Sequence, residues 1–134
     1  FTPSYSVDPA WYMDTGATDH LTGQLDKLAT RQPYTGHDQV RTANGSGMPI
    51  SHVGQASLLL RTTKTLCLLD VLRVPSVTRN LLSVPKLTYD NNVFVEFHPF
   101  HFFVKDRDTR AVLLSGRARV GLYALDVPRA LNVP

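Results

Sequence analysis

The sequence predicts an all-β fold, mainly strands with one short helix. Apolar runs of strand length alternate with turn residues along most of the 134-residue chain. Nine prolines and eight glycines are spread between these runs, as expected when many short strands are joined by turns. A hydrophobic fraction of 43% is enough to build a core, and 19% charged residues do not suggest disorder, so we expect one folded domain.

The first half of the chain predicts a strand, a loop and a hairpin. Trp11, Tyr12 and Met13 form a short apolar strand that enters a turn at Asp14-Thr15-Gly16. Residues 26–36 contain a proline and a glycine and predict a loop. The Asn-Gly pair in residues 43–49 (ANGSGMP) predicts a β-hairpin, in which Val40 and Thr42 lead to Ile50 and His52.

The middle and the end of the chain predict further strands and the helix. Residues 56–62 and 65–75 are strand-like, and the second run is so continuously apolar that we expect it to be buried on both faces. Residues 77–92 predict a short helix that ends at Asn91 and Asn92, with Pro85 acceptable only in a first turn. Four short strands are expected after it, in residues 93–99, 101–106, 110–116 and 121–127.

Composition excludes several classes of protein. No run approaches the roughly 18 apolar residues that a membrane helix needs, so we expect no membrane partner. Cys67 is the single cysteine, which excludes an intramolecular disulfide and a cysteine-based zinc site, and its apolar run predicts a small buried side chain rather than a reactive thiol. The net charge of +3 is mild and the late arginines are scattered, so a solvated sheet surface is favoured over a nucleic-acid interface.

Asp14-Thr15-Gly16 is the candidate for catalytic chemistry. A chain of this length contains an Asp-Ser/Thr-Gly by chance on the order of one time in twenty, so the context must carry the argument. An apolar strand leads into the tripeptide, and a Gly-tipped hairpin begins about 25 residues later. Other groupings are weaker. His98 and His101 lack a third ligand with zinc-site spacing, and Ser46, His52 and Asp14 lack the Gly-x-Ser-x-Gly elbow of a serine hydrolase.

Four motifs in order resemble a known family. They are WYMDTGATDHLTG, VRTANGSGMPISHVG, DVLRVPSVTRNLLSVPKLTYDN and GLYALD, which together span residues 11–126. The chain resembles the retropepsin-type aspartic proteases, and in particular the protease segment of Ty1/copia-type retrotransposon polyproteins. The resemblance implies a retropepsin-like half-barrel with a flap hairpin and extra C-terminal β-strands.

The resemblance also implies roles for individual residues. Asp14 matches the catalytic aspartate, and Thr15, Gly16 and Ala17 match the rest of the active-site loop, in which the threonine hydroxyl bonds across to the partner's loop. Asn44, Gly45, Ser46, Gly47 and Met48 match the flap that closes over the peptide. Arg79 and Asn80 begin the Arg-Asn-Leu-Leu stretch that opens the family's helix and supports the site.

The chain departs from the retroviral pattern at two positions. Thr18 stands where those enzymes carry a second aspartate that pairs with the helix arginine, so we expect Asp19 to pair with Arg79 instead. Thr78 replaces the glycine before that arginine.

The chemistry implied by the resemblance requires two chains. Two carboxylates about 3 Å apart share one proton; one activates a water and the other donates to the peptide carbonyl, without a metal or another cofactor. The sequence contains one Asp-Thr-Gly, since Asp70 and Asp126 lack the following Ser/Thr-Gly. A working site therefore needs a symmetric homodimer in which Asp14 meets Asp14 of a second copy.

We therefore expect an aspartic endopeptidase that processes a retrotransposon Gag-Pol polyprotein, including at its own borders, in the cytoplasm within virus-like particles. The expected division is an upstream linker (1–10), a protease core (11–92), a C-terminal β-hairpin extension (93–126) and the start of a linker to the pre-integrase region (127–134). Two alternatives stay open. One is a catalytically inactive scaffold or interaction module with the same fold, and the other is a nucleic-acid-binding β domain.

Overall fold

The computed structural model describes residues 10–41, 44–60, 65–119 and 121–125. Of the expected linkers, residues 1–9 and 127–134 lie outside the described residues, as do hairpin residue Thr42 and Asp126. The described part of the chain forms twelve strands, one α-helix and one short 3-10 helix. This confirms the prediction of a mainly β fold with one short helix.

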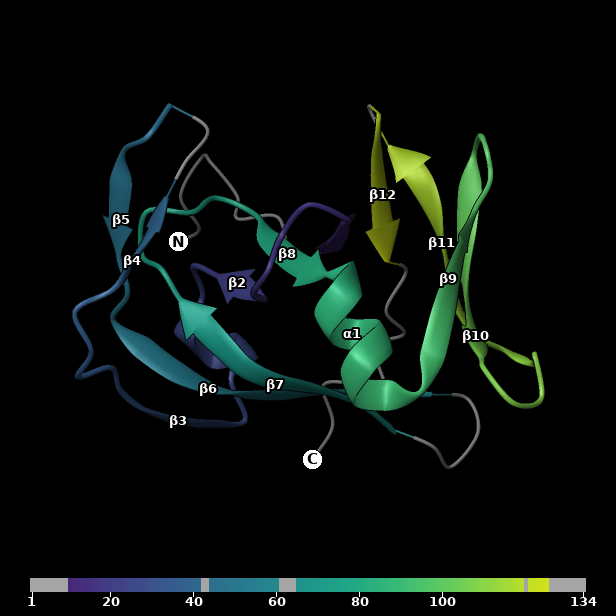
Figure 1. The fold of residues 1–134 in the computed structure, drawn as a ribbon, viewed down its shortest axis with the longest axis horizontal. Helices are drawn as coiled ribbons and strands as arrows, with labels where there is room; N and C mark the ends of the chain where they lie inside the picture. Colours follow the sequence, from purple (N-terminus) through teal and green to yellow (C-terminus); the bar gives the residue numbers. More distant parts are fainter. Residues whose placement is uncertain (1–9, 42–43, 61–64, 120, 126–134) are drawn as a thin grey trace, which may run out of the picture.

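Ten of the described strands form one continuous sheet (Figure 1). In sheet order they are β3 (Thr30–Pro33), β6 (His52–Leu59), β7 (Thr65–Arg73), β2 (Leu21–Thr22), β8 (Asn80–Ser83), β1 (Trp11–Asp14), β12 (Leu122–Leu125), β11 (Val112–Arg119), β10 (His101–Asp106) and β9 (Val93–Phe97).

The four C-terminal strands were predicted and are present, and they continue the same sheet. Strands β9 to β12 form an antiparallel meander, and β12 pairs with β1 at Trp11–Leu125 and Tyr12–Ala124. Strand β1 also pairs in parallel with β8, with Asp14 opposite Ser83. The strand that ends in Asp14 is therefore held on both edges.

One hydrophobic core joins the two ends of the sheet. Helix α1 (Val84–Asn91) lies against β7, β8 and β9 and buries Leu87 (Figure 1). Strand β1 and strands β6 to β12 contribute further side chains to the same cluster, including Met13, Leu68, Leu82 and Phe102. The core therefore fixes β1 through side chains as well as through its backbone pairing.

Strand β7 is buried on one face in its first half, which corrects the expectation that it is buried on both. Leu66 and Leu68 point into the core, whereas Thr65 and Cys67 are exposed. The expected buried position of Cys67 was wrong because side chains along a strand alternate between the two faces, and the register turns the even-numbered residues inward.

Helix α1 begins later than predicted. Asn80–Ser83 forms strand β8, so the Arg-Asn-Leu-Leu stretch does not open the helix. Ser83 caps the helix instead: its hydroxyl accepts a hydrogen bond from the Lys86 N–H at 3.2 Å. Pro85 lies in the first turn, as the sequence required, and Asn92 ends the helix in the left-handed conformation.

The region predicted as a loop contains a strand. Strand β3 pairs with β6 at the edge of the sheet, and all four of its residues are exposed. An exposed edge strand needs no apolar alternation, so its sequence gave no strand signal. A short 3-10 helix (Leu25–Lys27) precedes it.

The predicted hairpin is present and stands apart from the main sheet (Figure 1). Strand β4 (Gln39–Arg41) pairs with β5 (Gly47–Pro49). Gly45 has a φ of 89° at the tip, a backbone conformation that side chains disfavour and glycine adopts freely. The Ser46 N–H donates to the Asn44 Oδ1 at 3.1 Å, which orders the turn.

Candidate functional site

The site is built around Asp14, the last residue of β1. The Gly16 N–H donates to the Asp14 Oδ1 at 2.8 Å, so the turn fixes one carboxylate oxygen. The second oxygen has no hydrogen-bond partner among the described residues. Asp14 is half-buried, which leaves this oxygen accessible to a water, a peptide or a second carboxylate.

The loop after Asp14 is attached to the start of helix α1. The Ser83 hydroxyl donates to the Ala17 carbonyl oxygen at 2.7 Å, while the Ser83 N–H donates to the His20 Nδ1 at 2.9 Å. The His20 carbonyl oxygen accepts from the Leu72 N–H at 2.9 Å, which attaches the far end of the loop to β7. Ser83 therefore links the Asp14 loop, the buried histidine and the helix cap.

His20 is fully buried beneath this loop. Burial, and then the positive charge of Lys86, lowers the pKa of His20 from 6.5 to about 4, against the opposing effect of Asp90. Because Nδ1 accepts the Ser83 hydrogen bond, the neutral ring carries its proton on Nε2, which has no hydrogen-bond partner in the described structure. No local sequence pattern signals the burial of His20.

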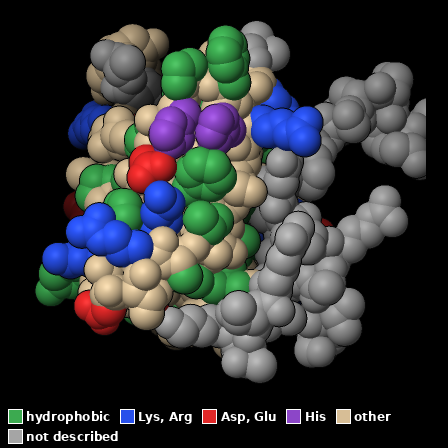
Figure 2. Space-filling model, turned by 90° about the vertical axis from the view of Figure 1, so that its right-hand side faces the viewer, with side chains coloured by type: hydrophobic (Ala, Val, Ile, Leu, Met, Phe, Trp, Pro, Cys, Tyr) green, Lys and Arg blue, Asp and Glu red, His purple; other side chains and the backbone are tan. Residues whose placement is uncertain are grey.

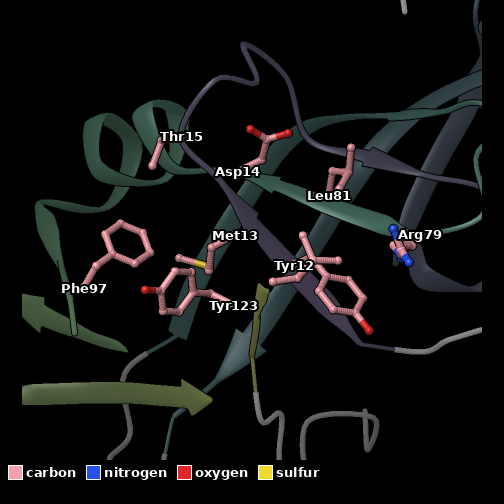
Figure 3. A pocket seen from close by; sticks show the side chains of 9 residues that line it. Tyr12, Met13, Asp14, Thr15, Arg79, Leu81, Phe97 and Tyr123 are labelled. Carbon is pink, nitrogen blue, oxygen red and sulfur yellow. The ribbon is translucent and has the colours of Figure 1, made fainter. Parts of the chain in front are cut away.

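A cavity of about 340 Å³ lies beside Asp14 (Figure 3). Strand β1 contributes Tyr12, Met13 and Asp14, and the following turn contributes Thr15. The remaining lining residues come from β8 and the segment before it, from the end of β9 and from the start of β12, namely Arg79, Leu81, Phe97, Leu122 and Tyr123. Among the described residues that line it, the cavity wall is mostly apolar and Asp14 is the single carboxylate.

Arg79 does not pair with Asp19, which corrects that expectation. Its guanidinium lies over the Tyr12 ring, 5.7 Å from the ring centroid, whereas the Asp19 carboxylate accepts from the Thr18 hydroxyl at 3.1 Å. An aromatic ring offers a cation a favourable surface in the absence of a carboxylate. Tyr12 could not be identified as this partner from the sequence, because the contact depends on the parallel pairing of β1 with β8.

Asn80 is buried and connects the surroundings of the site. It accepts from the Thr22 hydroxyl at 2.5 Å and donates to the Ala10 carbonyl oxygen at 3.3 Å. These bonds join β8 to β2 and to the residue that precedes β1. Asn80 therefore acts on the site through the backbone that carries Asp14, and not by contact with the cavity.

The predicted flap residues are not brought to the cavity in this single chain. Asn44 to Met48 lie at the end of the β4–β5 hairpin, and none of them lines the cavity. Thr15 does line it, beside Asp14. The structure thus joins the predicted loop to Leu122, Tyr123 and Phe97, which sequence reasoning did not assign to the site.

The His98 and His101 rings are stacked with their centroids 4.8 Å apart, and Figure 2 shows two histidine side chains next to each other on one face of the molecule. The His98 Nε2 is 2.6 Å from the Glu96 Oε2, and Lys105 also binds this carboxylate, so both partners lower the pKa of Glu96. Within the described ranges, no cluster of three or more metal-ligating side chains occurs. No described helix is long and apolar enough to cross a membrane.

Comparison with known proteins identifies the family that this chain resembles. The family model described as "Pol polyprotein, beta-barrel domain" matches residues 11–93. The chain is 45% identical over 113 residues to the retrovirus-related Pol polyprotein from transposon RE1 of Arabidopsis thaliana, and 46% identical over 113 residues to that from transposon RE2 of the same plant. Each match covers 84% of this chain but 8% of the relative, and no solved structure matches.

Proposed function

Because the chain belongs to the family of Pol polyprotein beta-barrel domains and is a segment of a retrotransposon Pol polyprotein, we propose that it is the aspartic endopeptidase of that polyprotein and acts as a homodimer. The observation that carries the proposal is the geometry of Asp14. This carboxylate ends a strand that is paired on both edges and has one oxygen fixed by the Gly16 N–H. It lies at a cavity whose described lining residues include no second carboxylate.

The proposed mechanism follows from this single carboxylate. Asp14 of each chain faces its counterpart at about 3 Å, where the two groups hold one proton because both cannot be charged at that distance. The ionised member removes a proton from water as the water attacks the peptide carbonyl, and the protonated member donates to the carbonyl oxygen. The tetrahedral species then collapses with a proton transferred to the leaving amine, and no covalent intermediate forms.

The proposed substrate is an extended segment of the polyprotein itself. An extended peptide offers backbone hydrogen bonds and alternating side chains, which a strand-rich site recognises by adding the peptide as a strand. The β4–β5 hairpin is the proposed lid, and its Gly45 tip suits a segment that closes on binding. We place this reaction in the cytoplasm, within virus-like particles, with the borders of the domain among the cleaved sites.

The proposal predicts that activity depends on protein concentration. The substrate is a peptide of the polyprotein that spans one border of this domain and lacks the domain itself, so that it cannot form mixed dimers with the enzyme. Below the dissociation constant of the dimer, the initial cleavage rate should rise with the square of the wild-type concentration, since only the dimer holds both carboxylates. Above that constant the rate should become linear.

Sedimentation of the wild-type protein over the same concentrations provides the control. The transition in rate order should coincide with the transition from monomer to dimer. A rate that is first order throughout, from a protein that sediments as a monomer, would exclude the shared dyad. Dimerisation without any cleavage would instead favour the inactive scaffold module.

A further inference from the structure

We propose that the outer face of the β9–β10–β11 meander binds single-stranded nucleic acid. The side chains that carry the proposal form what we call the meander face: Glu96, His98, His101, Phe103, Lys105 and Arg117. None of the six lines the cavity beside Asp14, so this surface is separate from the proposed catalytic site and does not depend on it.

Strand alternation and register put these side chains on one side of the sheet. Strand β10 buries Phe102 in the core and turns its two neighbours, His101 and Phe103, outward. Residues paired directly across antiparallel strands face the same side of a sheet. Glu96 of β9 is paired with Phe103, and Arg117 of β11 is paired with His101, so all three strands contribute to the face.

Three flat rings lie together on this face. His98 and His101 are stacked with 14° between their planes, and Phe103 meets them edge-on, with centroid distances of 5.6 Å to His98 and 4.9 Å to His101. The side chain of His98 is 38% exposed. Figure 2 shows a face on which two neighbouring histidine side chains lie among hydrophobic, Lys and Arg side chains. Unpaired bases stack on aromatic rings at such surfaces, whichever base is present.

Cations lie beside these rings. The Lys105 Nζ is 5.7 Å from the centroid of the Phe103 ring, and the Arg110 guanidinium is 5.7 Å from that of Phe94, the residue paired with Lys105. Arg117 is exposed at the other end of the face. A base that stacks on the rings therefore brings the phosphates on either side of it within reach of a positive charge.

The charge left over on this face is positive. Glu96 accepts from Lys105 at 3.0 Å, and Asp108 in the β10–β11 turn accepts from a side-chain amide at 3.0 Å. Arg110 and Arg117 form no ion pair with a carboxylate among the described residues. The late arginines are scattered in the sequence, and the meander brings two of them to one surface, whose complement is a polyanion.

A single strand fits the meander face better than the other polyanions do. The bases of a duplex are stacked on one another and cannot reach the rings. An acidic polypeptide could pair with the arginines, but its carboxylate side chains offer no flat group to the rings. Single-stranded nucleic acid supplies both the phosphates and the bases that this surface can bind.

The test measures binding of fluorescent oligo(U) and oligo(dT) strands of about 12 nucleotides to the 134-residue chain by fluorescence anisotropy. Both strands should bind at about 50 mM salt, and a duplex of the same length should bind more weakly. A plot of log affinity against log salt should have a slope of about −1.4, because Arg110 and Arg117 each neutralise a phosphate and each contact contributes about −0.7.

The contribution of stacking is tested at Phe103. Phe103→Leu keeps an apolar side chain but removes the ring, so we expect at least about fivefold weaker binding with an unchanged salt slope. Tyr89→Leu is the matched control, since Tyr89 is 88% exposed on α1, which packs on the core side of the sheet. Tyr89→Leu should bind the single strands as the wild type does.

The contribution of charge is tested by two substitutions with opposite expected effects. Arg117→Gln should weaken binding and reduce the slope to about −0.7, whereas Arg31→Gln on β3, at the opposite edge of the sheet, should leave the slope unchanged. Glu96→Gln removes a negative charge and releases Lys105 for a third phosphate. It should therefore tighten binding about two- to fivefold and steepen the slope to about −2.1.

The inference is overturned if neither single strand binds, or if folded Phe103→Leu binds as the wild type does. It is also overturned if the duplex binds as tightly as the single strands, since the rings then have no role. Polyglutamate that displaces the strands as well as unlabelled oligo(dT) does would identify an acidic polypeptide as the partner instead. Circular dichroism must show that each variant is folded; if Phe103→Leu is not, the opposite shifts of Arg117→Gln and Glu96→Gln decide.

Discussion

Replacing Asp14 with asparagine is expected to abolish cleavage of a peptide that spans a border of the domain, with kcat reduced at least about 10³-fold. Asparagine keeps the size of the side chain and an oxygen that accepts from the Gly16 N–H, so the turn should stay folded. It removes the ionisable group from both members of the dyad, so that neither can take a proton from water. The measurement is single-turnover cleavage of that peptide, with thermal unfolding as the check on folding.

Asp19→Asn is the matched control for this prediction. Asp19 is a neighbouring, partly buried carboxylate that accepts from the Thr18 hydroxyl and does not line the cavity. Its replacement is the same chemical change five residues away, and activity should stay within about twofold because a lost surface hydrogen bond contributes little. Cleavage by Asp14→Asn at the wild-type rate would refute the catalytic assignment. Equal losses of activity in both variants would show that the negative charge of this loop matters, and not the Asp14 carboxylate in particular.

A mixing experiment tests the shared dyad in a way that misfolding of the Asp14→Asn variant could not imitate. Excess Asp14→Asn protein should inhibit the wild-type enzyme, because mixed dimers contain one ionisable aspartate and cannot form the dyad. The inhibition should follow the statistical fraction of mixed dimers.

Short-range sequence patterns were enough to predict strand β10, the β4–β5 hairpin and the presence of helix α1. Alternation in residues 101–106 places Phe102 and Val104 in the core, and β10 has that pattern of burial. Asn44 and Gly45 predicted the hairpin because a tight turn needs a residue that accepts a positive φ. Pro85 restricted the helix to a start just before it, and Ser83 is a residue type that caps such a start. That signal was present in the sequence and could have placed the helix correctly.

The rest of the site depends on contacts between distant segments. The pairing of β1 with β12 joins residues more than a hundred positions apart, and no periodicity specifies which strand a short apolar run will pair with. Arg79 over Tyr12 and Ser83 bonded to His20 follow from the parallel β1–β8 register in the same way. The candidate tripeptide Asp14-Thr15-Gly16 could therefore be recognised from the sequence, whereas the residues that support and surround it could not.

His20 should make the domain sensitive to acid. Its folded-state pKa of about 4 lies below the ordinary 6.5, so the unfolded chain takes up a proton in a range where the folded protein does not. The stabilising effect is complete above pH 6.5 and is lost as the pH falls toward 4. The difference corresponds to about 3 kcal/mol of unfolding free energy, at about 1.4 kcal/mol per pKa unit. Urea unfolding at pH 7.5 and at pH 4.5 measures it.

Two substitutions of His20 distinguish the effect of its protonation from the effect of its hydrogen bond with Ser83. His20→Asn keeps an acceptor for the Ser83 N–H but cannot be protonated, whereas His20→Leu removes the acceptor and leaves that buried N–H unpaired, at a cost of about 1–3 kcal/mol. Both variants should lose most of the acid sensitivity, and the same change at exposed His37 should not affect it. If the His20 variants unfold in acid as the wild type does, His20 is not the responsible group.

Protonation of His20 should also limit how far into the acid range the proposed cleavage reaction can proceed. A carboxylate dyad works while it holds one proton, which favours mildly acidic conditions, but protonation of His20 would break its bond to Ser83 and free the Ala17 loop. We therefore expect kcat to fall on the acid side at a higher pH than the dyad alone requires. In folded His20→Asn protein the acid limb should shift to lower pH, whereas His20→Leu should lower kcat at every pH with little change in KM. An unshifted acid limb in His20→Asn would mean that the dyad alone determines the profile.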